Sequence, residues 1–323
     1  SASGTTMSNA INSIALRFSC WVFACWGVMA FAATPPADRF DGQRALQHIA
    51  QQVSFGPRSP GHKAKQQTID YIQKLLQPDA DQWVIQPFQR DELSGNNLWA
   101  SFYADSKSPT PQRRIMLAAH WDTRPIADRD SNNRNRSQPV IGANDGASGV
   151  AVLLEIARQL AAQPAPVTVD LIFFDLEDMG NINGLPFSIG ATEFVRKNRF
   201  YRPAAGVVVD MVCDRELVIP REGFSRQSAA RLQDHIWQIA ANQASDVFID
   251  RSGSFIEDDH LPFIKVGLEV VNLIHWPFPD SWHTSADSIE RCSAESLQKV
   301  GDVITELIYT FDTNAPLNQQ DAK

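Results

Sequence analysis

The chain has 323 residues, of which 43% are hydrophobic and 20% are charged, and its formal net charge at pH 7 is −8. This composition is ordinary for a folded protein, and the acidic balance gives no reason to expect a nucleic-acid partner. No internal repeat or heptad pattern is present. A chain of this length therefore suits one large domain with a sizeable core.

The first residues are predicted to lie outside this domain. Residues 1–6 precede the first methionine and are interpreted as an upstream extension or a remnant of cloning. Residues 7–33 contain Arg17 and then an apolar run, from Phe18 to Ala33, whose end carries the small residues Ala30 and Ala32. This run is shorter than the roughly 20 residues that a membrane-spanning helix needs. We therefore expect residues 7–33 to be a cleavable signal peptide.

The expected location follows from this signal peptide. The mature catalytic domain, residues 34–323, is predicted to be secreted or periplasmic, to have no membrane contact after cleavage and to be a monomer. Two alternatives stay open, namely an uncleaved segment that anchors the protein to a membrane and a lipid-modified Cys25. An oxidising compartment would permit a disulfide between Cys213 and Cys292, but the sequence is also compatible with two buried thiols.

Helical and strand patterns alternate along residues 34–323. Amphipathic periodicity predicts the helices, and short apolar or alternating runs predict the strands. In chain order we expect helices over residues 40–52 and 63–77, strands over 83–88, 97–103 and 114–119, a helix over 148–162, a strand over 167–174, a short helix over 190–196, a strand over 206–211, a helix over 225–243, a strand over 268–274 and a helix over 293–311. This order predicts a single α/β domain with a central, mostly parallel mixed sheet flanked by helices.

One apolar run ends abruptly in acidic residues. Residues 167–174, VTVDLIFF, are typical of a strand buried on both faces, and Glu177 and Asp178 follow in the segment DLEDMG. Sites in open α/β sheets form at the carboxyl ends of strands. Two adjacent carboxyl groups are rarely ionised at the same time unless a cation binds between them. We therefore expect one to bind a metal and the other to act as an acid or base.

Four more segments bring an acid or a histidine to this edge of the sheet. His120 follows the third predicted strand, Asp145 lies in a Gly-rich turn before a helix, Asp210 ends the fifth strand and His283 follows the last. A lone Asp at such a place is usually a helix cap or a turn residue. Five segments with this feature instead predict a zinc site, because zinc binds imidazole and carboxylate ligands and a catalytic zinc keeps one position open.

Six motifs, in this order, resemble the zinc-dependent M28 peptidase superfamily: AHWDTRP, GANDGASGVAVLLEIAR, FFDLEDMG, VVVDM, EDDHLPF and PFPDSWHTSADS. The last two are the specific part, and they resemble the animal-type glutaminyl cyclases and their bacterial relatives. The resemblance covers nearly all of residues 34–323. It implies the zinc-aminopeptidase-like, or phosphorylase/hydrolase-like, form of the α/β fold.

The resemblance also implies roles for the residues at the strand ends. Asp145, Asp178 and His283 resemble the three ligands of a single zinc ion, and Glu177 resembles the general acid/base. Residue 178 is Asp where the vertebrate cyclases have Glu, and either carboxylate suits zinc.

Other matched residues resemble the proton network and the substrate pocket. Asp258 resembles an acid that hydrogen-bonds with the acid at Asp210 in support of catalysis. Trp282 and Phe278 resemble walls of the substrate pocket. The loop 181–188 lacks a tryptophan that the vertebrate cyclases place near their pocket, so the resemblance carries over the chemistry but not the substrate affinity and selectivity.

These roles predict a glutaminyl-peptide cyclotransferase with one zinc ion per chain. Such an enzyme converts the amino-terminal Gln of peptides or proteins to pyroglutamate and releases ammonia. Zinc can polarise the γ-amide carbonyl, and Glu177 can move the proton. The alternative is a two-zinc M28 aminopeptidase, in which His120 and Asp210 hold the second zinc and Asp145 bridges. A non-catalytic binding domain is disfavoured, because the expected ligands and the base are all present.

Overall fold

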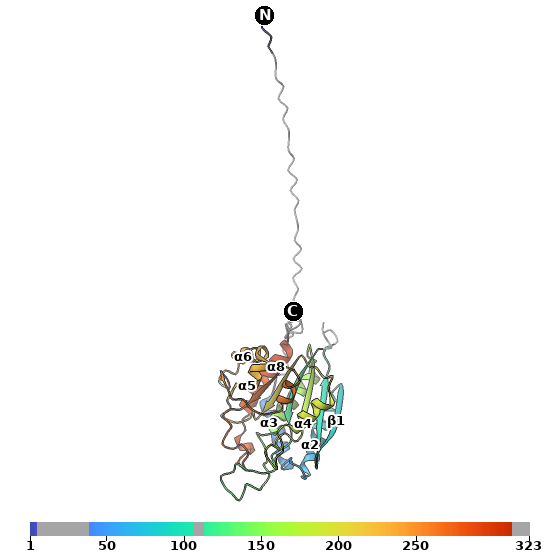
Figure 1. Ribbon diagram of the computed structural model, residues 1–323, viewed down its shortest axis with the longest axis vertical. Helices are drawn as coiled ribbons and strands as arrows, with labels where there is room; N and C mark the ends of the chain where they lie inside the picture. Colours follow the sequence, from blue (N-terminus) through green and yellow to red (C-terminus); the bar gives the residue numbers. More distant parts are fainter. Residues whose placement is uncertain (5–38, 106–112, 312–323) are drawn as a thin grey trace. The chain divides into compact units, whose positions relative to one another are not determined.

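The structure is a computed structural model that describes residues 1–4, 39–105 and 113–311 (Figure 1). Chain contacts divide the molecule into two units, Ser1–Ala32 and Ala33–Lys323, and every described helix and strand belongs to the second. The predicted signal peptide, residues 7–33, lies outside the described residues together with Cys25, so it stays a prediction. Within the described ranges, no helix combines the length and the hydrophobicity that crossing a bilayer requires.

A six-stranded sheet runs through the second unit. Its strands are β1 (Gln82–Arg90), β2 (Leu93–Phe102), β3 (Arg114–His120), β4 (Thr168–Phe174), β5 (Ala205–Asp210) and β8 (Val270–Ile274). The order is β1-β2-β4-β3-β5-β8, in which β4, β3, β5 and β8 are parallel and β1 and β2 add an antiparallel edge. All of β4 is buried. The structure therefore confirms the mostly parallel mixed sheet and the strand buried on both faces.

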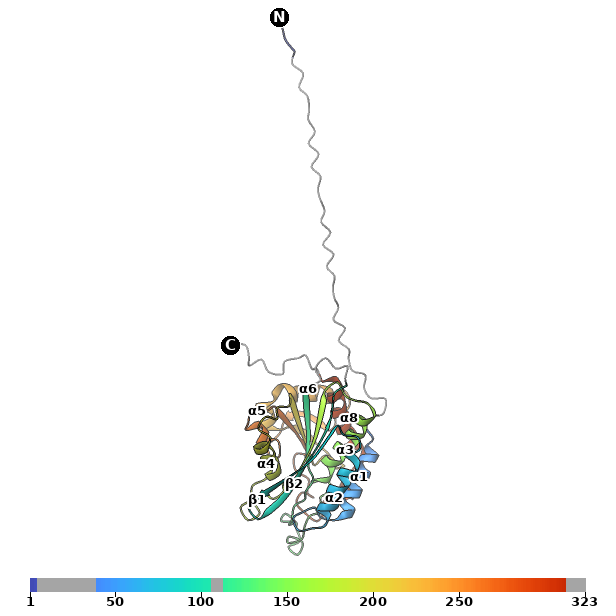
Figure 2. The same cartoon turned by 90° about the vertical axis from the view of Figure 1, so that its right-hand side faces the viewer.

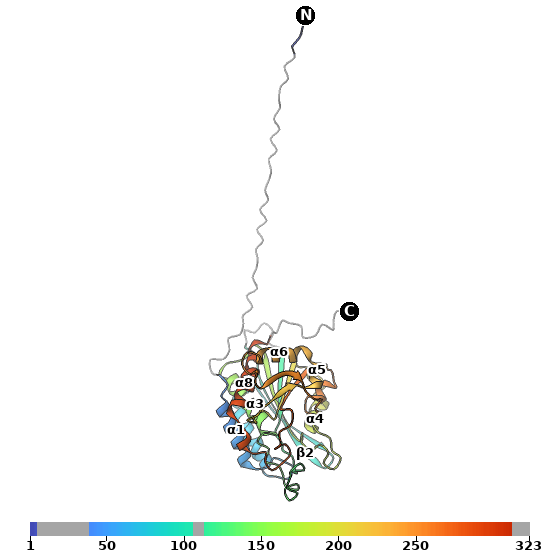
Figure 3. The same cartoon turned by 90° about the vertical axis from the view of Figure 1, so that its left-hand side faces the viewer.

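Helices cover both faces of the sheet. They are α1 (Gly42–Phe55), α2 (Ala64–Leu76), α3 (Ala147–Ala162), α4 (Ile189–Lys197), α5 (Gly223–Ser228), α6 (Ala230–Ala240), α7 (Leu261–Ile264) and α8 (Ala294–Thr310). Figure 2 shows α1, α2, α3 and α8 on one side of the strands and α4 and α5 on the other, and Figure 3 shows these layers from the opposite direction. Leu117 packs with the first layer, whereas its neighbour Met116 packs with α4 and α7. Alternate strand residues thus build two cores.

The structure differs from the predicted elements where these are short or broken. The helix predicted over 225–243 is α5 followed by α6, because the backbone at Ala229 leaves the helical region, with φ −136° and ψ 41°. Sequence analysis did not identify α7 or three further short elements, which are β6 (Ile219–Arg221), β7 (Phe248–Ser252) and a 3-10 turn at Ile289–Arg291. Elements of this length are too short to show a periodicity.

A disulfide joins Cys213, which follows β5, to Cys292, which precedes α8. The two positions are 79 residues apart in the sequence. The structure thus decides between the bridge and the two buried thiols that the sequence left open.

Replacing Cys213 and Cys292 together with serine is expected to lower the free energy of unfolding by about 4 kcal/mol, because the open chain gains conformational entropy when it unfolds. Urea unfolding with and without a thiol reductant measures this change. The double variant is the control, since reductant should not alter its stability. A parent protein whose unfolding midpoint is insensitive to reductant would contradict a stabilising bridge.

Candidate active site

The chain reverses its direction across the sheet between β3 and β5. From β3 it crosses through α3 to β4 on one side, and from β4 it returns through α4 to β5 on the other side of β3. A crevice at such a switch point is the usual ligand site of an open α/β sheet. Ala118 pairs with Val208, so His120 and Asp210, which end the two strands, lie side by side.

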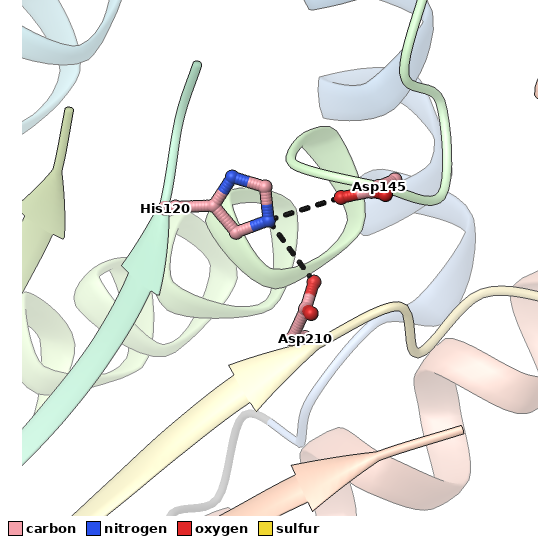
Figure 4. Close-up of side chains that lie close together, drawn as sticks. All are labelled: His120, Asp145 and Asp210. Carbon is pink, nitrogen blue, oxygen red and sulfur yellow. Dashed lines mark hydrogen bonds and ion pairs between the residues drawn. The ribbon is translucent and has the colours of Figure 1, made fainter. Parts of the chain in front are cut away.

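His120 joins Asp210 and Asp145 in one buried group (Figure 4). Its Nε2 atom lies 3.1 Å from an Oδ1 atom of each carboxylate. Burial alone would lower the pKa of His120, but the neighbouring carboxylates, led by Asp210, raise it well above its ordinary value. The three side chains come from β3, β5 and the turn before α3, and together they could hold a metal ion.

The three residues that resemble zinc ligands form a second buried group, which shares Asp145 with the first. Asp145, Asp178 and His283 each offer a ligand atom, and these atoms lie within 4.8 Å of one another. His283 Nε2 is 3.1 Å from Asp178 Oδ1 and 3.6 Å from Asp145 Oδ2. Asp178 Oδ2 is buried and has no hydrogen-bond partner among the described residues. An orphaned carboxylate oxygen in a set of one imidazole and two carboxylates suits a zinc ion.

Side chains that sequence analysis did not select hold the segment after β4. The Asp122 carboxylate accepts hydrogen bonds from the backbone N–H groups of Glu177 at 3.0 Å and Asp178 at 3.2 Å. The buried Arg124 guanidinium donates to Asp178 Oδ1 at 3.1 Å and to the carbonyl oxygen of Gly180 at 3.2 Å. Such partners orient metal ligands. Both residues belong to the motif AHWDTRP, which carries the resemblance without revealing their contacts.

An acid and an arginine, Asp287 and Arg58, likewise hold the turn before α3. Asp287 accepts backbone hydrogen bonds from Asn144 at 2.8 Å and Asp145 at 3.0 Å. Burial, followed by the charge of Asp145, raises the pKa of Asp287 to about 7. Arg58, which is also fully buried, donates to the carbonyl oxygen of Gly142 at 2.6 Å. These contacts fix the backbone that presents Asp145.

Two glycines let α3 begin directly beside the site. Gly146 has φ of +102°, a conformation that residues with a Cβ rarely adopt. A Cβ there would also collide with the carbonyl oxygen of Asp122. A Cβ at Gly149 would collide with the carbonyl oxygen of Val209. The Gly-rich turn therefore places Asp145 close to the ends of β3 and β5.

Glu177, the predicted acid/base, lies beside the Asp145–Asp178–His283 group. It is 6% exposed, and Ser188 Oγ donates to its Oε1 atom at 3.3 Å. Burial raises the pKa of Glu177 well above its ordinary value; His120 opposes this shift, whereas Asp258 and Asp259 add to it. A carboxyl group with a raised pKa can serve as a general acid or base.

Asp258 and Asp210, the predicted acid pair, influence one another electrostatically. Burial, followed by the charge of Asp210, raises the pKa of Asp258 to about 6. Burial also raises the pKa of Asp210. Asn272 Nδ2 donates to Asp258 Oδ2 at 2.7 Å. Two acids in such a relation favour sharing one proton, and the hydrogen bond expected between them stays a prediction.

A pocket of about 220 Å³ is lined by these acids. Trp282 and Phe278, the predicted walls, both line it, and their ring centroids are 4.3 Å apart. The indole of Trp282 stacks on His283 at 3.8 Å. Trp276 also lines the pocket and packs edge-on against Phe278 at 4.7 Å. The pocket therefore has an acidic floor and aromatic walls.

The loop 181–188 also contributes an aromatic residue to the pocket, although it lacks a tryptophan. Phe187 lines the pocket, and the guanidinium carbon of Arg124 lies 6.0 Å from the centre of its ring. Sequence analysis did not identify this residue, because a single phenylalanine in a loop gives no periodic signal.

The backbone is held in an uncommon conformation at several places around the site. Leu176, Met211 and His283 have φ angles of +58°, +49° and +57°. Residues with a Cβ adopt the left-handed region at a cost of about 1 kcal/mol or more, and such residues cluster at functional sites. Each of the three lies at or next to a residue that sequence analysis assigned to catalysis or metal binding.

The sequence model of peptidase family M28 matches residues 97–308. The chain belongs to this family. The match begins in β2 and ends in α8, so it contains His120, Asp145, Glu177, Asp210 and His283.

Two curated relatives of the M28 family differ in how much of their length this chain covers. Aminopeptidase YwaD of Bacillus subtilis is 27% identical over 214 residues, which are 60% of this chain and 40% of the relative. The glutaminyl-peptide cyclotransferase of Bos taurus is 26% identical over 282 residues, which are 76% of this chain and 75% of the relative. The chain thus spans less than half of the aminopeptidase and three quarters of the cyclotransferase.

A solved structure has the same fold over most of its length. The glutaminyl cyclase of Bacteroides thetaiotaomicron, bound to N-acetylhistamine, matches with a TM-score of 0.78 and 32% identity, over 84% of this chain and 98% of that chain. These comparisons confirm the predicted α/β fold, the resemblance to M28 enzymes and, within them, the resemblance to glutaminyl cyclases.

Proposed function

We propose that this M28 family member is a glutaminyl-peptide cyclotransferase that acts on peptides and proteins beginning with Gln. The observation that carries the proposal is the pocket, in which Glu177 lies beside the Asp145–Asp178–His283 group and Trp282 forms a wall. The similarity to glutaminyl cyclases supports it, since the chain covers 75% of the bovine cyclotransferase and 98% of the solved cyclase of Bacteroides thetaiotaomicron.

We assign one zinc ion per chain to Asp145, Asp178 and His283. The donor set and the orphaned oxygen of Asp178 support this assignment. When bound there, zinc supplies a Lewis acid that polarises the γ-amide carbonyl of the substrate and stabilises charge on its oxygen.

The chain's own residues supply proton transfer and orientation. The α-amine nitrogen of the substrate forms a bond to its γ-amide carbon, and the bond from that carbon to the amide nitrogen breaks, which releases ammonia. Glu177 accepts a proton from the amine and returns it to the leaving nitrogen. Asp258 and Asp210 share one proton. This pair keeps Glu177 in the charge state in which it can accept a proton from the amine. Trp282 and Phe278 hold the side chain in a curled conformation, which favours an intramolecular attack.

A two-zinc aminopeptidase is the alternative, and one observation favours it. His120, Asp145 and Asp210 are also grouped closely enough to hold a metal ion. In that case Glu177 would activate a water molecule, and a free amino-terminal residue would be released.

We also propose that the protein is a secreted or periplasmic monomer whose residues 7–33 form a cleaved signal peptide. The disulfide between Cys213 and Cys292 supports this location, because such bonds persist in oxidising compartments. Retention of residues 7–33 as a membrane anchor is the alternative. The amino-terminal sequence of the protein isolated from its host distinguishes them.

Mass spectrometry of two peptides tests the reaction. One peptide begins with Gln and the other with Leu, and both are incubated with the zinc-loaded protein. Loss of ammonia from the Gln peptide, with the Leu peptide intact, is the expected result. Stepwise release of Leu would instead support the two-zinc aminopeptidase.

A further inference from the structure

The mouth of the pocket is formed by the segment that precedes α7, which has no regular secondary structure. Four consecutive residues of this segment line the pocket. Their exposure alternates, with Phe255 and Glu257 exposed and Ile256 and Asp258 buried. Ile256 and Asp258 therefore face the interior of the pocket, and Phe255 and Glu257 stand at its opening to solvent.

Phe255 is exposed but firmly supported. Its side chain is 56% exposed, and its ring packs edge-on against Phe224, with 5.0 Å between the centroids. The ring also covers Gly223 so closely that a Cβ there would lie 2.8 Å from its carbon atoms. A large apolar side chain held in place at a pocket mouth is typical of a binding surface.

The backbone on both sides of Phe255 is fixed as well. The Gly223 N–H group donates to the carbonyl oxygen of Ser254 at 2.9 Å. The Ile256 N–H group donates to Oε1 of the buried Glu222 at 3.1 Å. A ligand that contacts Phe255 therefore meets a surface that needs little ordering when it binds.

The exposed charge at the mouth of the pocket is negative. Glu257 supplies an exposed carboxylate there, and no lysine or arginine is among the described residues that line the pocket. The Arg129 guanidinium lies over the ring of Trp282, 4.6 Å from its centre, outside this lining. The mouth therefore attracts cationic groups and repels anionic ones.

The size of the pocket indicates what reaches its mouth. Its volume of about 220 Å³ is below the roughly 300–1,000 Å³ of sites that enclose drug-sized ligands. One amino acid residue fills such a space, and the next residue of an extended peptide lies about 3.5 Å further along the chain. The pocket thus has room for one residue, and the second residue of a peptide would lie at the mouth, which Phe255 and Glu257 line.

We propose that Phe255 and Glu257 form a subsite for the second residue of the substrate, which favours an aromatic side chain and disfavours Asp or Glu. This proposal rests on the proposed cyclisation of amino-terminal Gln. It names the preferred substrates as peptides that begin with Gln followed by an aromatic residue.

Three peptide amides test the subsite: Gln-Phe-Ala, Gln-Gly-Ala and Gln-Asp-Ala. The value of kcat/KM is expected to be about fivefold higher with Phe than with Gly, because an aromatic contact stabilises the complex. It is expected to be about threefold lower with Asp than with Gly at low salt, and this difference should shrink near 1 M salt as charges are screened. Both differences should lie mainly in KM, since the contacts are remote from the reacting atoms.

Two single variants separate the two contributions. Phe255→Ala is expected to abolish the preference for Phe over Gly while the discrimination against Asp persists. Glu257→Gln is expected to do the reverse. Phe200→Ala is the matched control, because Phe200 is 98% exposed and does not line the pocket; both ratios should be unchanged. Each ratio compares kcat/KM for two peptides on the same preparation of one variant. It therefore does not depend on the fraction of that variant that is folded.

The outcomes distinguish the subsite from the reaction. Equal kcat/KM for all three peptides, or a Phe preference that survives in Phe255→Ala, would overturn the subsite and leave cyclisation intact. Failure of the parent protein to cyclise any of the three would overturn the proposed function, and the subsite with it.

Discussion

Replacement of Glu177 with Gln is expected to lower kcat by about a thousandfold while zinc stays bound. The amide has nearly the same shape as the carboxyl group, but it cannot accept the proton of the substrate amine. Glu177 is not among the three residues assigned to zinc, and its backbone is held by Asp122, so the site should keep its geometry. Steady-state cyclisation assays and metal analysis of the same preparation measure the two effects.

The neighbouring acid provides a matched control for this variant. Asp178→Asn makes the same chemical change one residue further on, but at a residue assigned to the metal. It is expected to lose zinc as well as activity. Loss of zinc in Glu177→Gln and retention in Asp178→Asn would mean that the roles of the two carboxylates are exchanged.

Replacement of His283 with Ala is expected to weaken zinc binding by more than about 100-fold, because even partners of metal ligands change affinity by roughly 10–100-fold. His283 is the one imidazole in the assigned group, and its Nε2 atom approaches both carboxylates. Metal content after dialysis, measured by elemental analysis, should fall from near one per chain to near zero. Cyclisation should be lost with it.

His120→Ala is the matched control, because it removes another buried imidazole that also contacts Asp145. Under the one-zinc assignment its metal content equals that of the parent protein. A parent protein with two zinc ions per chain, one of which His120→Ala loses, would favour the aminopeptidase. Zinc retained at one per chain in His283→Ala would refute the ligand assignment.

The sequence was sufficient to predict the parts of the fold whose patterns are long and strongly apolar. The strand at β4 and the helix at α3 carry such patterns, and the acids that follow the parallel strands could be assigned to one edge of the sheet because parallel strands end together. Asp145, Asp178 and His283 were matched through motifs, and the structure brings them into one group.

Other parts of the site depend on contacts between residues far apart in the chain. Asp287 holds the backbone of Asp145 across 142 positions, and nothing in its local sequence distinguishes it from a turn residue. Arg58 lies in a Pro-rich turn, where an exposed side chain is the usual expectation, yet it is fully buried. Phe255 follows a segment with no periodicity, so its place at the pocket mouth emerges only from the tertiary fold.

The bridge between Cys213 and Cys292 also decides what a proteolytic cut does to this protein. The bridge closes the intervening chain into a covalent ring that contains Asp258 and His283, whereas Asp145 and Glu177 precede it. A protease that cuts the chain at the exposed residue Glu257 would leave both fragments attached to one another. In a compartment with proteases but few thiols, the nicked protein keeps both halves of its site in one molecule, and the fragments separate only after reduction.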